Sequence, residues 1–115
     1  MSAADALKAF LEPILPGWRT QFGRWDDVPA ERCAVIKPSG GPSRPLLREP
    51  VFTLHLVSAN GDATGVARDA AEAVVAATKT DSGGLVHIEA SEPAYWWTKD
   101  GRHAFDISLS AMQGV

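Results

Sequence analysis

The sequence predicts an α+β fold with a mostly antiparallel sheet of four or five strands and two helices packed on one face. Residues 3–12 and 64–78 carry apolar residues at helical spacing, whereas residues 51–57 and 103–112 alternate apolar and polar side chains as strands do. These segments follow one another in the order helix, strands, helix, strands. With 115 residues, the chain has the length of a single domain spanning residues 1–115.

The first half of the chain begins with the amphipathic helix and continues into strands. In residues 3–12 the apolar side chains fall on one helical face, and Pro13 ends the helix. Residues 18–22 are predicted as a short strand, and the β-branched run CAVIK at 33–37 as a buried one. Four prolines and two adjacent glycines make residues 38–50 a long loop or irregular hairpin.

The second half contains the clearest strand, VFTLHLV, followed by a turn and the longer helix. Asp62 or Thr64 is predicted to cap the start of that helix. Alanines dominate residues 64–78, so the helix is thin and can lie close against a sheet. Residues 85–90 and 103–112 are predicted as the last strands.

The face of the sheet opposite the helices is expected to be half-polar and open to water or to a partner. The side chains predicted to lie on it are Thr53, His55, His87, Glu89, Ser108 and Ser110. If they form a pocket wall, the chain is a small-molecule-binding α+β module, with His55, His87 and Ser108 in the pocket. This is the alternative to the function considered below.

Composition excludes several other classes of partner. Eleven basic and fourteen acidic residues are spread along the chain, giving a net charge of -3, and no basic stripe suggests binding to nucleic acid. The start of the chain lacks the pattern of a signal peptide, and no apolar run is long enough to cross a bilayer. The expectation is a cytoplasmic-type protein without a membrane partner.

Patterns for catalysis or metal binding are weak. DSGG at residues 81–84 resembles the nucleophile segment of chymotrypsin-like serine proteases, but it falls where a helix must stop. His55, His87 and His103 lack the spacing of a metal site, so they are expected to face solvent or a protein interface. A metal-dependent hydrolase that uses them is the third hypothesis. Cys33 begins an apolar strand and is predicted to be buried. We therefore predict a protein that is not an enzyme and uses no cofactor or metal.

Aromatic residues point to a protein contact instead. The segment EPAYWWTKDGRH places Trp96 and Trp97 next to each other, and a strand sends successive side chains to opposite faces. One indole should therefore be exposed at a subunit boundary, unless the strand bulges and the N-terminal segment covers both rings. Exposed tryptophans are frequent anchors of protein interfaces.

The loop at residues 38–50 is the second predicted contact. It presents apolar residues between basic ones, and long loops without secondary structure are more often functional than accidental. The residues assigned to this protein contact are Arg44, Leu46, Leu47, Arg48 and Glu49.

The order of elements is familiar as a whole. A short helix leads to GRWDDVPAERCAVIKPSGG at residues 23–41, then come a Pro-rich loop, VFTLHLV, an Ala-rich helix and SEPAYWWTKDGRHAFDISLSAM at residues 91–112. This layout resembles the tail terminator proteins (minor tail or tail completion proteins) of long-tailed bacteriophages and related tail-like particles. The resemblance covers nearly the whole chain and depends mainly on the order of the elements.

The resemblance implies a structural role in the virion tail, with assembly in the host cytoplasm. The expected form is a ring, usually a hexamer, that caps the last ring of the tail tube, stops its growth and offers a surface to the head. Its partners would be further copies of itself, the tail tube protein and the head–tail connector or head completion protein. DNA would pass through the lumen without sequence-specific recognition. A head-to-tail ring needs two different, complementary patches, which the two predicted contacts would supply.

Overall fold

Two helices and seven strands are present in the part of the chain that the structure, a computed structural model, describes. The structure describes residues 3–23, 31–40, 47–48, 50–81, 83, 85, 87–98 and 101–114. The elements are α1 (Ala3–Leu11), β1 (Trp18–Phe22), β2 (Arg32–Pro38), β3 (Leu47–Arg48), β4 (Val51–Val57), α2 (Thr64–Thr78), β5 (His87–Ala90), β6 (Ala94–Trp97) and β7 (His103–Gly114). The predicted helices and main strands lie close to their expected boundaries.

The strands form an open sheet built around the long strand β7. The order β1-β2-β4-β7 continues on the far side of β7 with β5 and β6, which pair with different halves of that strand. β1 runs parallel to β2, and the other pairs are antiparallel. The two-residue β3 pairs with the end of β7. The predicted α+β class with a mostly antiparallel sheet is confirmed, and the additional short strands raise the strand number above the four or five expected.

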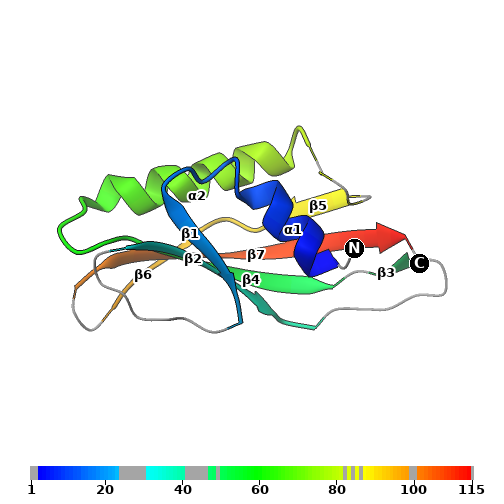
Figure 1. The fold of residues 1–115 in the computed structure, drawn as a ribbon, viewed down its shortest axis with the longest axis horizontal. Coiled ribbons are helices and arrows are strands. Elements are labelled where there is room, and N and C mark those ends of the chain that lie inside the picture. The colour runs from blue at the N-terminus through cyan, green and yellow to red at the C-terminus, as the bar shows by residue number, and fades with distance from the viewer. Residues whose placement is uncertain are drawn as a thin grey trace.

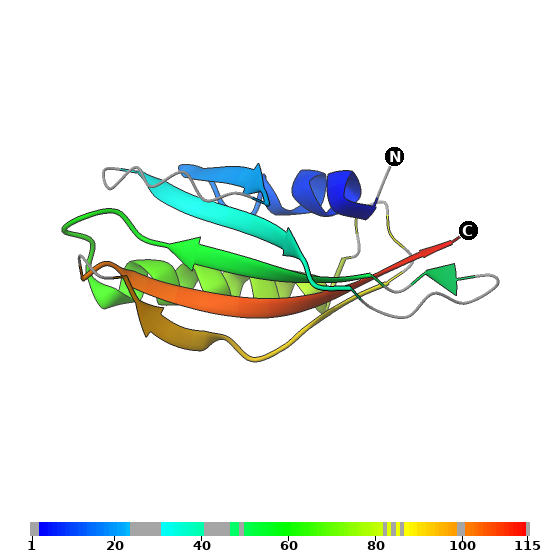
Figure 2. The same cartoon turned by 90° about the horizontal axis from the view of Figure 1, so that it is seen from below.

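Both helices cover the same face of the sheet, as predicted. α2 runs along the sheet in Figure 1 and lies behind it in Figure 2. The core between helices and sheet is apolar; its largest fully buried members are Leu7, Leu11, Ile36, Leu54, Leu56, Ile88, Ile107 and Leu109. The buried positions of α2 are alanines and valines, so short side chains let this helix pack close to the strands.

The opposite face carries the expected polar residues over a smaller apolar layer. The pairs Thr53–Ser108 and Glu89–Ser110 are in register, which places these side chains on one face. Cys33 also belongs to this face and is fully buried, as predicted. The sheet therefore has a helix side that is covered over its centre and a partly polar second side.

The start of α2 differs from the prediction. Ala63 occupies the N-cap position, and no side chain forms the capping hydrogen bond. Thr64 is already the first helical residue. Asp62 instead accepts hydrogen bonds from the Ala59 N–H, at 2.9 Å, and from Arg32. The prediction was wrong because a residue thirty positions earlier in the chain competes for the carboxylate.

A tight hairpin turn joins β6 to β7 and positions the aromatic segment. The Thr98 N–H donates to the Arg102 carbonyl at 3.0 Å, and the Arg102 N–H donates to Thr98 Oγ1 at the same distance. Gly101 in this turn has φ +84°, a conformation that favours glycine. The turn fixes the register in which Tyr95 pairs with Phe105 and Trp97 with His103.

Candidate protein-interaction surface

The two adjacent tryptophans of β6 lie on opposite faces of the sheet, as alternation predicted. Trp97 is 67% exposed and is the most exposed large hydrophobic residue among those described. Trp96 is half-buried on the second face. The strand does not bulge to hide both rings, so one indole of this pair is available to a partner.

Trp97 belongs to an ordered group of rings at the edge of the helix side. Its ring lies 6.1 Å from that of Tyr95, which also contacts His103 at 5.9 Å and Phe105 at 5.3 Å. The Tyr95 hydroxyl is 2.7 Å from His103 Nδ1, and His103 Nε2 is 3.2 Å from Thr64 Oγ1 at the start of α2. We call Tyr95, Trp97 and His103 the aromatic edge. Hydrogen bonds hold the rings of Tyr95 and His103, and Trp97 packs beside Tyr95, so the group is ordered before any partner binds and the entropic cost of binding is lower.

Trp96 is fixed on the second face by a partly buried polar contact. Its indole N–H donates to Asp106 Oδ1 at 2.6 Å, and His55 Nδ1 lies 2.6 Å from the same oxygen. The imidazole also meets the indole edge-on, with 6.3 Å between ring centroids. The carboxylate thus connects β6 to β4 across β7.

The second predicted contact lies mainly outside the described residues. Arg44, Leu46 and Glu49 fall there, as do all residues from 41 to 46. Leu47 and Arg48 form β3, whose backbone pairs with residues 113–114 of β7. The assignment of these five residues to a protein contact stays a prediction.

The three histidines do not come together. His103 lies on the helix side, and His55 and His87 occupy distant positions on the second face, opposite Asp106 and Met112 of β7. Among the described residues, no cluster of histidine, cysteine and carboxylate side chains could hold a metal ion. The cavity beside His55 measures about 90 Å³, well below the roughly 300 Å³ of small-molecule sites.

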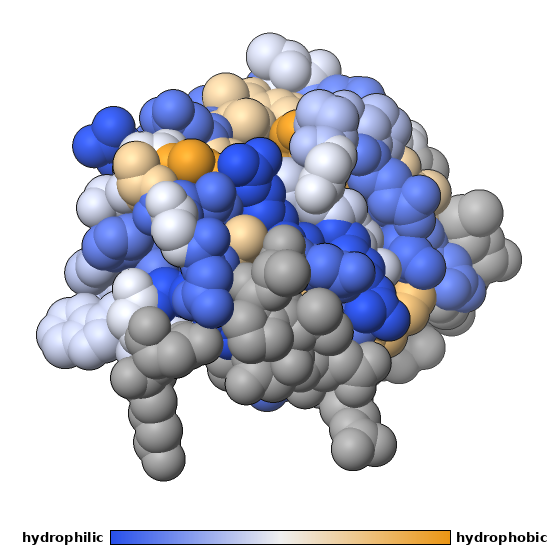
Figure 3. Space-filling model, turned by 60° about the vertical axis from the view of Figure 1, so that its left-hand side comes forward, coloured by the Kyte–Doolittle hydropathy of each residue, from blue (hydrophilic) through white to orange (hydrophobic). Residues whose placement is uncertain are grey.

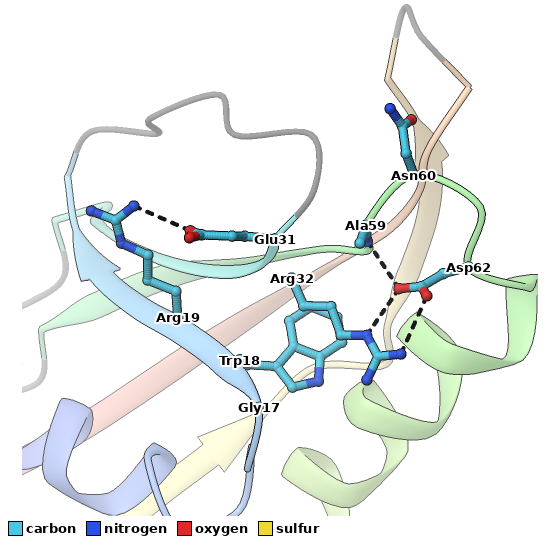
Figure 4. Close-up of a pocket in the computed structure, with 8 residues that line it drawn as sticks. All are labelled: Gly17, Trp18, Arg19, Glu31, Arg32, Ala59, Asn60 and Asp62. Carbon is cyan, nitrogen blue, oxygen red and sulfur yellow. Dashed lines mark hydrogen bonds and ion pairs between the residues drawn. The ribbon is translucent and has the colours of Figure 1, made fainter.

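A larger cavity of about 740 Å³ opens where β1 and β2 begin, beside the turn before α2. Arg32 points its guanidinium at Asp62 there, as Figure 4 shows, with Nε–Oδ2 2.9 Å and Nη2–Oδ1 3.2 Å. Arg19 pairs with Glu31 at 3.3 Å on the rim. The charged side chains of this cavity are thus engaged with one another.

The surface around β6 is mostly hydrophilic. Figure 3 brings this end of the molecule forward and shows only small, scattered hydrophobic groups among its coloured residues. Within the described residues, neither helix has the length and apolar character needed to cross a membrane. Exposed aromatic rings on a hydrophilic end are typical anchors of a specific protein contact rather than parts of a broad apolar patch.

Comparison with known protein families decides the class. The family model of phage tail termination proteins matches residues 1–114. The chain belongs to this family. No curated protein matches the sequence.

Membership in the tail terminator family confirms the resemblance inferred from the order of elements. The tail terminator is a structural protein of the virion tail that acts in tail completion, not a member of an enzyme family. It therefore interacts with tail and head components. The aromatic edge is a candidate surface for such contacts.

Sequence reasoning missed several residues of this surface in the tail terminator. Tyr95 shares the face of Trp97 because the two are separated by two positions, so the alternation that predicted Trp97 could have found it. His103 was considered only as a solvent-facing or interface histidine and Asp106 was assigned no role, since their partners are brought close only by the strand register. No local signal marked those long-range contacts.

In this terminator, replacing Asp62 by asparagine is expected to lower the free energy of unfolding by about 1 kcal/mol at pH 7. The hydrogen bond from Arg32 lowers the pKa of Asp62 in the folded protein. The stabilisation that the ionised carboxylate gives is therefore fully present above the pKa of the unfolded state, and it is lost as the pH falls through the lower pKa of the folded state. Urea unfolding between pH 7 and pH 3 checks this. The two proteins should converge at the acidic end, whereas a constant difference would contradict the role of the carboxylate charge. Glu31→Gln, at an exposed ion pair, is the control and should have a smaller effect.

Proposed function

We propose that this terminator forms a homo-oligomeric ring, most simply a hexamer, that caps the last ring of the tail tube. The cap ends polymerisation of the tube protein and presents the surface that the head–tail connector or head completion protein joins. Assembly takes place in the host cytoplasm, and DNA passes through the lumen of the finished ring. Family membership supports the role in tail completion, and the aromatic edge supports self-association.

The observation that carries the proposal is the exposed and pre-ordered pair Tyr95–Trp97. An isolated protomer gains nothing from leaving a tryptophan two-thirds exposed while a network of hydrogen bonds fixes its neighbours. Burial in a contact with another subunit would recover the hydrophobic contribution of both rings. We place Trp97, held by Trp96, at the subunit boundary.

A second contact is assigned to the loop. Arg44, Leu46, Leu47, Arg48 and Glu49 would touch the tail tube or the head connector, because β3 extends from the sheet at the end of β7 far from β6 (Figure 2). Each subunit of such a ring must contact its neighbouring subunits and also the tail tube or the head connector. Two surfaces at different ends of the subunit fit these two tasks.

Native mass spectrometry of the purified protein, with negative-stain microscopy of the protein on isolated tail tubes, tests the ring. A closed oligomer in solution or a ring at the tube end is expected. In a tube polymerisation assay, adding the protein should shorten the tubes. Protein that remains monomeric, is absent from tube ends and leaves tube length unchanged would contradict the proposal.

Trp97→Ala is expected to raise the dissociation constant of subunit association by about 30-fold or more, since a central tryptophan of an interface contributes about 2 kcal/mol or more. Analytical ultracentrifugation over a concentration series measures this effect. Because Trp97 is exposed in the protomer, the melting temperature of the dilute, monomeric protein should barely change. Trp97→Phe keeps a large ring and should lose much less affinity. Equal association by wild type and Trp97→Ala would remove this residue from the boundary.

A further inference from the structure

An apolar groove lies between α1 and the end of α2, on the helix side of the molecule. Its volume is about 520 Å³, and its apolar lining consists of Ala6, Ala9, Phe10, Pro13, Ile14 and Ala77. We call it the α1–α2 groove. Small residues, Ala6 and Ala9 on α1 and Ala77 on α2, line it and leave space that larger side chains would occupy. Gly83 closes one end, where a Cβ would approach the Phe10 ring at 3.3 Å.

The groove and the aromatic edge lie at different ends of the protomer. In Figure 1, β6 is at the left-hand end, whereas α1 and the end of α2 are on the right. The molecule is 47 Å long, so Trp97 cannot reach the groove of its own chain while β6 stays paired with β7. An apolar projection and an apolar hollow on separate parts of one molecule can meet only between copies, in a head-to-tail contact.

The two surfaces also match in polarity. Trp97 offers an indole N–H donor on an otherwise apolar body. Among the described residues that line the groove, Asp81 is the only charged one, and its Oδ1 accepts the Gly83 N–H at 3.1 Å. The aromatic edge contacts the start of α2 through Thr64, and the groove lies at the end of the same helix. The positive end of one helix dipole would therefore approach the negative end of the next.

We propose that Trp97 of one subunit inserts into the α1–α2 groove of the next, with its indole N–H directed at Asp81 and Tyr95 covering the rim. This inference rests on the proposed self-assembly and specifies which two surfaces meet. Such a contact is heterologous, because each subunit gives its aromatic edge to one neighbour and its groove to the other. A repeated heterologous contact closes into a ring when its rotation permits.

Site-specific photo-crosslinking tests the contact directly. p-Benzoylphenylalanine at position 97 keeps a large aromatic group and reacts with whatever surrounds it. Light and ¹⁵N-labelled copies are mixed, assembled alone and on tail tubes, irradiated and digested. Crosslinks between light and heavy copies that join position 97 to residues 6–14 or 77–83 are expected.

The outcomes separate this inference from the ring itself. Crosslinks from position 97 to β6 of another copy would show an isologous, two-fold contact, and crosslinks to tube protein would show another partner; either would overturn the groove contact, whereas rings seen at tube ends would still support the ring itself. An absence of oligomers and of rings at tube ends would overturn both proposals.

A matched pair of variants provides a second measurement. Ala9→Arg fills the groove from an exposed helical position and should weaken association by about 30-fold or more, as Trp97→Ala does. Ala76→Arg adds the same side chain at an exposed position of α2 outside the groove lining and should leave association unchanged. Melting temperatures of both variants should stay near that of the wild type. Equal association of Ala9→Arg and Ala76→Arg would overturn the inference.

Discussion

Leu54→Ala is expected to lower the free energy of unfolding by about 3–4 kcal/mol. Leu54 is fully buried in the middle of β4, where it stands opposite Ile36 of β2 on one side and Ile107 of β7 on the other. All three side chains point at the helices and have no contact with water. Removing the isobutyl group loses its hydrophobic contribution and leaves a cavity that a rigid central strand cannot close.

The size of this effect follows from the helix above the sheet. The buried positions of α2 are alanines and valines, whose short side chains cannot extend into a cavity. Chemical denaturation at neutral pH measures the loss, with Leu54→Met as the control because it nearly conserves volume and should cost less than about 1.5 kcal/mol. A loss below about 1 kcal/mol for Leu54→Ala would mean that α2 and the sheet are not closely packed at this position.

Local patterns in the sequence were sufficient to predict the main helices and strands. Strand β4 is predictable because every second side chain from Phe52 to Leu56 faces the core, which leaves apolar and polar residues alternating in FTLHL. α2 is predictable because its buried alanines and valines repeat at helical spacing. The opposite directions of Trp96 and Trp97 follow from the same rule, which applies to any regular strand.

Contacts between distant parts of the chain were not predictable in this way. The parallel pairing of β1 with β2 and the split of the far edge into β5 and β6 depend on which strands meet in three dimensions. Asp62 has the local signal of a helix cap, yet its partner Arg32 comes from another strand. The α1–α2 groove is formed by small side chains from two helices and has no motif of its own.

The candidate site shows the same division. The exposure of Trp97 is predictable from strand alternation. The α1–α2 groove that we propose as its partner forms only when the two helices pack together. The residue that secures the anchor, Asp106, appears in the sequence merely as an outward-facing position of β7. Its importance comes from the register, which brings His55 of β4 and Trp96 of β6 to the same carboxylate oxygen.

Asp106→Ala is therefore expected to lower the free energy of unfolding by about 2–3 kcal/mol and to loosen β6. Two donors lose a charged acceptor, and hydrogen bonds to charged groups contribute about 1.5–3 kcal/mol each. Partial exposure of the carboxylate lets water replace some of this contribution, which keeps the expected loss near the value for one bond. Among the described strands, β6 pairs with β7 alone, so its four residues depend on this anchor more than the central strands do.

Amide hydrogen exchange distinguishes this local effect from general destabilisation. In Asp106→Ala, the amides of β6 should exchange faster by a larger factor than those of β4, because the strand that carries Tyr95 and Trp97 loses its attachment on the second face. Subunit association should weaken with it, since the aromatic edge is no longer held in one arrangement. Asp106→Asn keeps a carbonyl oxygen for the Trp96 N–H and should show a smaller change in both measurements. Equal protection of β6 in wild type and Asp106→Ala would show that pairing with β7 alone orders the aromatic edge.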